Sequence, residues 1–122
     1  MKSIVILISG RGSNMESLLR AVADGSLPVR VAAVISNRPD AKGLEIAAAQ
    51  EVETCVVDHT RFDSRESFDA AMIKTIDSYA PDLVVLAGFM RILTDDFVRR
   101  YEGRLLNIHP SLLPSFPGLH TH

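Results

Sequence analysis

An asparagine and a histidine near the end of this sequence could do chemistry together. The apolar residues Leu105 and Leu106 lead into Asn107, and His109 follows with one residue between them. On a strand, alternate side chains share a face, so we expect Asn107 and His109 to point the same way. An amide can stabilise a developing oxyanion, and an imidazole can transfer a proton near neutral pH. The spacing therefore predicts a catalytic pair, although a hydrogen-bonded structural pair would have the same pattern.

A glycine-containing segment follows the first apolar run. It reads Gly10-Arg11-Gly12-Ser13-Asn14, and the spacing of Ser13 and Glu16 predicts a helix whose first turn is capped by Ser13. Backbone N–H groups at such a helix start could bind a phosphate. The segment lacks the third glycine of the dinucleotide fingerprint and the Gly-Lys-Ser/Thr of a P-loop. A phosphate loop and a simple tight turn both remain open.

A third segment, Met90-Arg91-Ile92-Leu93, mixes apolar side chains with one cation. Such a segment could form a slot for a flat heterocycle, or it could pack Met90 and Ile92 into the core. Composition alone favours a solvated charge for Arg65, in the first turn of another predicted helix. No Ser or Cys nucleophile with a matching base stands out, which favours direct group transfer over a covalent intermediate.

The elements that must position these residues alternate along the chain. Apolar runs predict strands, and helical patterns with Asp63 and Glu66 or Thr94 at helix starts lie between them. We expect strands at 3–8, 29–35, 54–57, 83–87 and 104–108, and helices from 13 to before Gly25, at 41–50, from about 63 to before Pro81, and from 94 to before Gly103. This alternation predicts an α/β fold with a doubly wound, mostly parallel sheet. The three segments above would then meet at the carboxyl ends of the strands.

Composition narrows the classes of function. The 122 residues fit one domain, and a net charge of −2 gives no global field that would attract nucleic acid. No apolar run reaches the roughly 18 residues of a membrane span. The single cysteine, Cys55, fits a reducing cytoplasm, and His59 is predicted on the surface. His120 and His122 have no third ligand in sight, so we expect no metal.

Four motifs carry a resemblance to a known family. They are Ile8-Ser9-Gly10-x-Gly12-Ser13-Asn14, Phe62-Asp63-Ser64-Arg65-Glu66, Leu86-Ala87-Gly88-Phe89-Met90-Arg91-Ile92-Leu93 and Leu106-Asn107-Ile108-His109-Pro110-Ser111-Leu112-Leu113-Pro114. With them, the chain resembles the N-terminal part of the phosphoribosylglycinamide formyltransferase family from end to end. The last motif is shared by a wider group of folate-dependent formyltransferases, and the Gly-Ser-Asn segment narrows the choice. The resemblance implies a Rossmann-like fold and a cytoplasmic enzyme, monomeric or homodimeric, of de novo purine biosynthesis.

The resemblance also implies roles for individual residues. Gly12, Ser13 and Asn14 would bind the phosphate of glycinamide ribonucleotide, Asn107 would bind the formyl oxygen, and His109 would transfer the proton. Arg65, Met90, Arg91, Ile92, Leu93 and Asn107 would contact 10-formyltetrahydrofolate, the formyl donor. The cosubstrate would then be this folate, with no metal, nucleic acid or membrane partner.

The sequence departs from the family in length. The aspartate that pairs with the family's histidine has no counterpart among the 122 residues. We therefore expect residues 1–122 to form a single formyltransferase catalytic domain that is truncated in the loop after Pro114, a fragment of a longer enzyme. A cis peptide before Pro114 is a further expectation. Alternative functions are a formyltetrahydrofolate deformylase and an inactive ligand-binding fragment of a formyltransferase.

Overall fold

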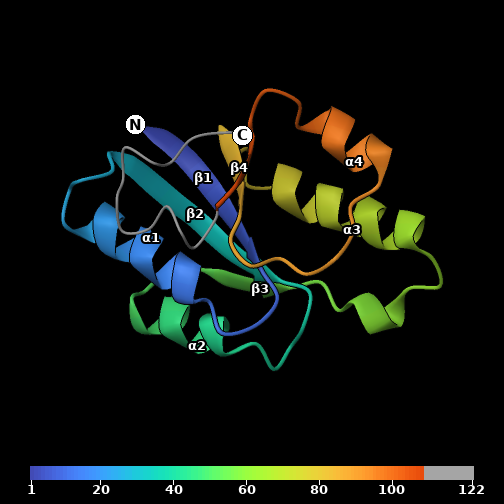
Figure 1. Cartoon of the computed structure of the whole chain (residues 1–122), viewed down its shortest axis with the longest axis horizontal. Helices are drawn as coiled ribbons and strands as arrows, with labels where there is room; N and C mark the ends of the chain where they lie inside the picture. The colour runs from blue at the N-terminus through green and yellow to red at the C-terminus, as the bar shows by residue number, and fades with distance from the viewer. Residues whose placement is uncertain (109–122) are drawn as a thin grey trace.

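Strands and helices alternate along the chain, as the apolar runs predict (Figure 1). The structure, a computed structural model, describes residues 1–108. Its elements are β1 (Lys2–Ile8), α1 (Ser13–Ala23), β2 (Val29–Ser36), α2 (Lys42–Ala49), β3 (Thr54–Val56), the short 3₁₀ helix η1 (His59–Arg61), α3 (Arg65–Asp77), β4 (Leu83–Leu86), α4 (Asp95–Arg100) and β5 (Leu105–Asn107). His109, Pro114, His120 and His122 lie outside the described residues, so the expectations placed on them stay predictions.

The five strands form one parallel sheet in the order β3-β2-β1-β4-β5. The chain builds outward from β1 on one side and then returns to add β4 on the other. The order therefore reverses between β1 and β4, and ligands of open α/β sheets bind at the carboxyl end of such a reversal. In register, Leu7 of β1 pairs with Leu86 of β4, and Leu86 pairs with Asn107 of β5. The three strands thus end at nearly the same level.

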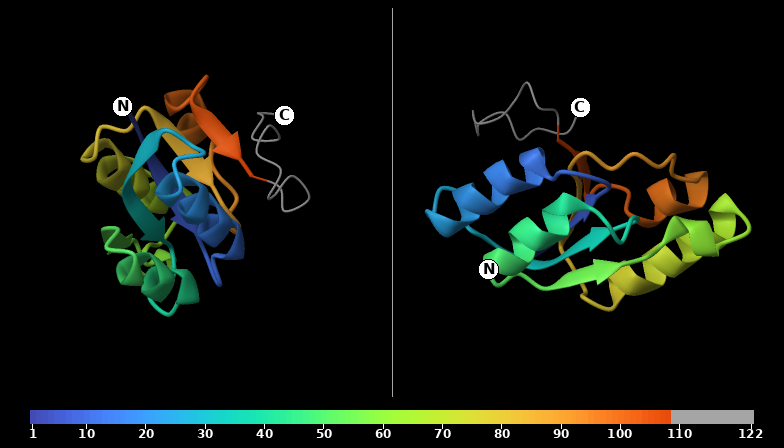
Figure 2. Two further views of the ribbon diagram at one scale, coloured as in Figure 1. Left: turned by 90° about the vertical axis from the view of Figure 1, so that its left-hand side faces the viewer. Right: turned by 90° about the horizontal axis from the view of Figure 1, so that it is seen from below.

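Two helical layers cover the sheet (Figure 2). Helices α1 and α2 pack on one face, and α3 and α4 pack on the other. Alternate residues of β1 supply both cores: Ile4 and Ile6 face α1 and α2, whereas Val5 and Leu7 face α3 and α4. All four side chains are at most 2% exposed. A central strand that is buried on both faces accounts for the nearly unbroken apolar run at the start of the sequence.

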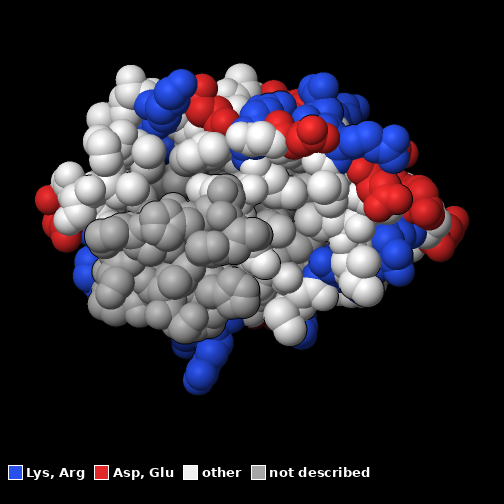
Figure 3. Space-filling view, turned by 45° about the horizontal axis from the view of Figure 1, so that its top comes forward, with Lys and Arg blue, Asp and Glu red and all other residues white. Residues whose placement is uncertain are grey.

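Helix α4 is fastened to α3 by a polar cluster at its C-terminal end. The hydroxyl of buried Tyr101 donates to Asp77 Oδ1 over 2.8 Å, and Arg100 donates to Asp77 Oδ2 over 2.7 Å. Burial, followed by the hydrogen bond to Asp77, raises the pKa of Tyr101. Charges of both signs are intermixed over this side of the molecule (Figure 3). None of the helices among residues 1–108 is long and apolar enough to cross a bilayer.

The helix starts confirm one predicted cap and correct two others. Thr94 caps α4 as predicted, because its hydroxyl accepts the N–H of Phe97. The start of α3 is capped by Ser64 paired with Ser67, so the prediction of Asp63 and Glu66 was wrong by one residue. Both pairs have the same spacing, and the extended backbone of Ser64 decides between them. Ser13 does not cap α1, as the site geometry explains.

Candidate active site

Residues 10–14, hereafter the glycine loop, comprise the end of the connection between β1 and α1 and the first two residues of α1. Gly12, with φ of 75°, occupies the N-cap position, and Ser13 is the first residue of the helix. The carbonyl of Gly12 accepts the N–H of Glu16 over 2.7 Å. Because Ser13 is already helical, it cannot cap α1, and no side chain within residues 1–108 does so. The first-turn N–H groups of an 11-residue helix are therefore available to an anion.

The glycine loop is packed tightly against the start of α2. The N–H of Gly43 donates to the carbonyl of Gly10 over 3.0 Å. A Cβ on Gly12 would lie 2.9 Å from Gly43 Cα, and one on Gly43 would lie 2.6 Å from Ile8 Cδ1. Gly43 looks unfavourable within a predicted helix, yet the structure requires it there for this close approach. Two glycines in contact thus fix the loop without side chains.

A second loop, residues 88–93, faces the glycine loop from the end of β4, and we call it the methionine loop. It has no regular secondary structure, as predicted. Met90 is 79% exposed and Ile92 is 69% exposed, so the interpretation that they pack into the core was wrong. Leu93 is half-buried against the α3–α4 core. The guanidinium of Arg91 lies 5.8 Å from the ring centre of Phe68.

A cavity of about 220 Å³ lies between the two loops. Residues 10–14 line one side of it, and Ala87, Gly88 and Met90 line the other. The predicted convergence of these two loops at the carboxyl ends of the strands is confirmed. An uncapped helix start therefore faces a hollow of mixed polar and apolar lining, with the methionine loop on its other side.

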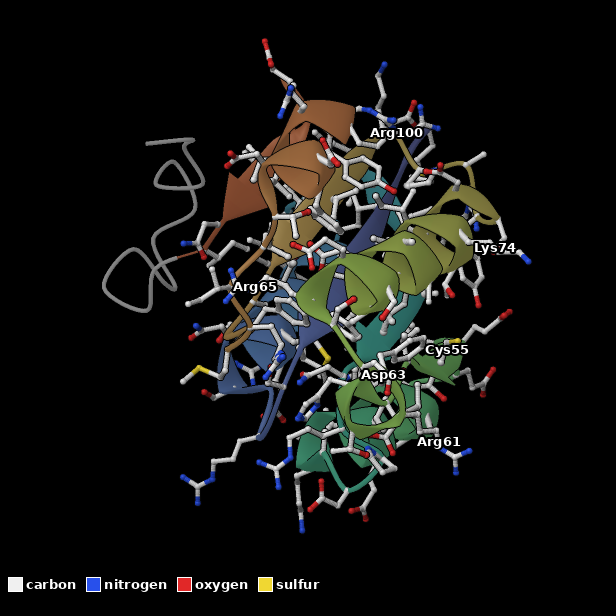
Figure 4. All side chains as sticks on the ribbon, turned by 90° about the vertical axis from the view of Figure 1, so that its right-hand side faces the viewer. Cys55, Arg61, Asp63, Arg65, Lys74 and Arg100 are labelled. Carbon is white, nitrogen blue, oxygen red and sulfur yellow. The ribbon has the colours of Figure 1, made fainter. Side chains whose placement is uncertain are left out.

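Asn107 and Arg65 lie at other positions around this edge. Asn107 is the last residue of β5 and is exposed, so the predicted strand delivers its amide to the carboxyl edge of the sheet. Its expected partner His109 lies outside the described residues. Arg65 is the first residue of α3 and is exposed, at the opposite end of the helix from Lys74 (Figure 4). It precedes Phe68, which contacts Arg91, by about one helical turn.

A buried polar network beside the two loops escaped the sequence interpretation. Ser9 Oγ accepts the N–H of Met90 over 2.8 Å and donates to Asn37 Oδ1 over 2.5 Å. Asn37 Nδ2 lies 3.1 Å from His59 Nδ1, and His59 is half-buried rather than on the surface as predicted. Hydrogen bonds from the side chain and N–H of Thr60 lower the pKa of neighbouring Asp58. Only the turn-like composition after β2 hinted at Asn37, since its partners come from distant segments.

Asp69 is a second functional candidate that sequence patterns did not reveal. It lies on α3 and is 2% exposed. Its Oδ2 accepts the N–H of Thr94 over 2.7 Å, directly after the methionine loop, and its Oδ1 has no partner within residues 1–108. In the sequence, Asp69 looks like one of the surface charges of α3, and nothing local shows that it is buried. The methionine loop is thus held near both ends by buried polar side chains.

Comparisons with known proteins give the context of this site. A family model described as formyl transferase matches residues 2–122. Phosphoribosylglycinamide formyltransferase of Escherichia coli is 55% identical over 98% of this chain and 57% of that protein. The trifunctional purine biosynthetic protein adenosine-3 of Drosophila melanogaster is 46% identical over 98% of this chain and 9% of that protein.

Solved structures agree with the sequence comparison. The phosphoribosylglycinamide formyltransferase of Coxiella burnetii superposes with a TM-score of 0.86 and 50% identity, over 93% of this chain and 53% of that one. Glycinamide ribonucleotide transformylase 1 of Symbiobacterium toebii superposes with a TM-score of 0.86 and 46% identity, over 98% of this chain and 56% of that one. The chain spans just over half the length of these single-function relatives. By sequence and by fold, the chain belongs to the formyl transferase family.

Proposed function

We propose that the chain carries the substrate-binding loops of an enzyme that transfers the formyl group of 10-formyltetrahydrofolate to the amine of glycinamide ribonucleotide, in de novo purine biosynthesis. One observation carries the proposal: the uncapped start of α1 faces a cavity of about 220 Å³ whose opposite wall is the methionine loop. An anion-binding helix start and an apolar loop are what a phosphorylated acceptor and a folate donor need. The relatives named above bear the corresponding activity in their names.

The glycine loop would hold the phosphate of the acceptor. Gly12, Ser13 and Asn14 place backbone N–H groups at the positive end of the α1 dipole. The absence of a Cβ at Gly12 lets a phosphate approach the backbone closely. This orientation would direct the amine of glycinamide ribonucleotide across the cavity toward Gly88 and Met90.

The methionine loop would hold the formyl donor. Exposed Met90 and Ile92 offer apolar contacts to a pterin ring, and Leu93 anchors the loop in the core. Arg91 and Arg65 offer cations to the carboxylates of the folate tail. Met90 and Ile92 therefore form a ring-binding group and Arg91 and Arg65 a charge-binding group, with Leu93 as the anchor of the loop.

The chemistry would be direct transfer. The amine attacks the formyl carbon, and Asn107 donates a hydrogen bond to the oxyanion of the tetrahedral intermediate. His109 takes the proton from the attacking nitrogen and returns one to the folate nitrogen as the carbon–nitrogen bond breaks, leaving tetrahydrofolate. No metal is needed. Asn107 stands at the sheet edge for this role, whereas the role of His109 rests on the sequence motif.

The setting of this reaction is part of the proposal. Small-molecule substrates, the mixed surface charge and the lone cysteine fit a cytoplasmic enzyme without nucleic-acid or membrane partners, acting as a monomer or homodimer.

Formyl transfer by the purified 122-residue chain tests the proposal. With 10-formyltetrahydrofolate and glycinamide ribonucleotide, we expect formylated product, reduced about 10²–10³-fold by Asn107→Ala and about 10²–10⁴-fold by His109→Ala. Gly12→Ala should instead weaken binding of the acceptor, because an added Cβ would displace the backbone N–H groups of the glycine loop. Hydrolysis of the donor without acceptor would favour a deformylase, and binding of both ligands without turnover would favour an inactive binding chain. Failure to bind either ligand would contradict the proposal.

A further inference from the structure

The methionine loop needs an external support, because it contains no helix or strand and its central side chains are exposed. The N–H of Met90 donates to Ser9 Oγ over 2.8 Å, across 81 residues of sequence. Ser9 directly precedes Gly10, so the residue that accepts this hydrogen bond is joined by a peptide bond to the first residue of the glycine loop. One hydroxyl therefore joins the two loops that border the cavity.

The Ser9 hydroxyl is itself held in place. Ser9 is 4% exposed, and because its oxygen accepts from Met90, its proton is directed to Asn37 Oδ1, 2.5 Å away. Asn37 is 2% exposed, with its N–H donating to the carbonyl of Ile8 and its own carbonyl accepting the N–H of His59. Its amide nitrogen lies 3.1 Å from His59 Nδ1, and that same Nδ1 lies 3.0 Å from the Asn37 carbonyl oxygen, so the tautomer of His59 decides which of the two contacts is the hydrogen bond. The N–H, the carbonyl and the Oδ1 of Asn37 are thus each hydrogen-bonded.

The Ser9–Met90 hydrogen bond lies at the boundary between two cavities. One is the 220 Å³ cavity of the glycine loop, and the other, of about 280 Å³, is lined by residues that include Asn37, His59 and Arg91. Gly10 and Met90 line both of them. A shift of Met90 would therefore move a formyl donor bound on one side relative to a formyl acceptor bound on the other side. Transfer between two bound reactants is sensitive to displacements of about 1 Å.

The two loops do not depend on Ser9 equally. The glycine loop has its own supports, since Gly43 donates to Gly10 and Gly12 packs on Gly43. The backbone N–H of Met90, in contrast, donates its hydrogen bond to the Ser9 hydroxyl. Loss of that hydroxyl should therefore move the methionine loop and leave the glycine loop in place.

We propose that Ser9, oriented by Asn37, is a positioning residue that holds the methionine loop in register with the glycine loop for formyl transfer. This inference rests on the proposed function for its ligands. The mechanical part, support of Met90 by Ser9, stands on the hydrogen bonds alone. Ser9 acts through Met90 and is not expected to touch the reacting atoms.

Ser9→Ala tests this role, with Ser36→Ala as the matched control. Ser36 is also a fully buried serine at the end of a neighbouring strand, and its hydroxyl bonds twice to the backbone of Arg38, outside both loops. In the full 122-residue chain, Ser9→Ala should accelerate hydrogen exchange of the Met90 amide about tenfold and raise the Kd for tetrahydrofolate about 5–20-fold. The Kd for glycinamide ribonucleotide should change less than about twofold. Ser36→Ala should change neither Met90 exchange nor the ratio of the two Kd values.

Each outcome decides one of the two proposals. Unchanged Met90 exchange in Ser9→Ala, or equal weakening of both ligands, would overturn the positioning role. If wild-type chain binds no tetrahydrofolate, the proposed function fails, and Met90 exchange still decides whether Ser9 holds the loop. Asn37→Ala gives a second variant that keeps the Ser9 hydroxyl but removes its acceptor, and it should accelerate Met90 exchange by a smaller factor than Ser9→Ala.

Discussion

The glycine loop and the methionine loop end neighbouring strands, yet they are held in place by different means. Backbone packing holds the glycine loop: Gly12 has φ of 75° and lies against Gly43, and Gly43 donates to Gly10. Side chains from other elements hold the methionine loop, with Ser9 at Met90 and Asp69 at Thr94. The first arrangement tolerates almost no added volume, whereas the second depends on a few buried polar atoms.

This difference suits the two ligands proposed for the loops. A phosphate is small, symmetric and bound by backbone N–H groups, so its site benefits from a rigid backbone. A folate is large and flat, and exposed side chains such as Met90 and Ile92 can adapt to its ring. The variants below address one loop at a time and so test whether the two supports are separable.

The largest effect is expected for Gly12→Ala in the glycine loop. A Cβ there would lie 2.9 Å from Gly43 Cα in a left-handed backbone, so we expect a loss of about 2–4 kcal/mol in the free energy of unfolding. The Kd for glycinamide ribonucleotide should rise at least about tenfold, because the N–H groups move. Urea unfolding and isothermal titration calorimetry measure the two quantities.

Gly25→Ala is the control for backbone strain. Gly25 also has a left-handed backbone, φ of 83°, but a Cβ there would meet nothing within 4 Å. We expect a loss of about 1–2 kcal/mol with unchanged ligand affinity. Equal effects of both substitutions would show that the contact with Gly43 contributes nothing, and the contrast between the loops would fail.

A smaller effect is expected for Asp69→Ala at the far end of the methionine loop. It removes the acceptor of the Thr94 N–H from a buried site, which should cost about 1.5–3 kcal/mol of unfolding free energy. Hydrogen exchange of the Thr94 amide should accelerate, while that of the glycine loop should not. Asp69→Asn keeps an acceptor oxygen and should restore most of the protection of Thr94.

Asp96→Ala controls for loss of a carboxylate. Asp96 lies on α4 with a side chain that is 89% exposed and 3.6 Å from Arg99. We expect a change below about 0.5 kcal/mol. Faster amide hydrogen exchange in the glycine loop of the Asp69→Ala variant would contradict the idea that the two loops have separate supports.

Sequence patterns predicted the parts of the fold that depend on local chemistry. Apolar runs located all five strands within residues 1–108, because a parallel sheet buries both faces, and glycines marked both loops. The cap of α1 was predicted wrongly because its start is decided by the packing of Gly12 on Gly43, which lies 31 positions later. Ser9, Asn37, His59 and Asp69 escaped for the same reason. Their roles come from partners 22 to 81 residues away, and no local pattern records them.

Apart from the control variants, the smallest effect concerns α4, the helix that follows the methionine loop. Burial favours the neutral form of Asp77, but hydrogen bonds from Arg100 and Tyr101 outweigh it, and the pKa of Asp77 lies below its usual value. Because its carboxyl has a lower pKa in the folded chain, the unfolded chain binds more protons than the folded chain at acidic pH. The contribution of the Asp77 carboxylate to the free energy of unfolding is therefore complete above the unfolded pKa of about 3.9, and it is lost as pH falls through the lower folded pKa. Asp77→Asn should therefore destabilise the chain by about 0.5–1 kcal/mol at pH 7 and by less near pH 3.

Urea unfolding of the wild-type chain and of the Asp77→Asn variant across pH 3–7 measures this difference in the free energy of unfolding. A difference that stays constant over the range would show that the charge of Asp77 contributes nothing. Asp77 fastens the C-terminal end of α4 to α3, whereas Asp69 holds Thr94 at the N-terminal end. Protonation of Asp77 should therefore loosen the C-terminal end of α4 first. Amide exchange should then accelerate in α4 of the wild-type chain while the N–H of Gly43 keeps its protection, since its hydrogen bond to the Gly10 carbonyl involves no titratable group. Parallel loosening of the glycine loop would mean that the two loops share one support.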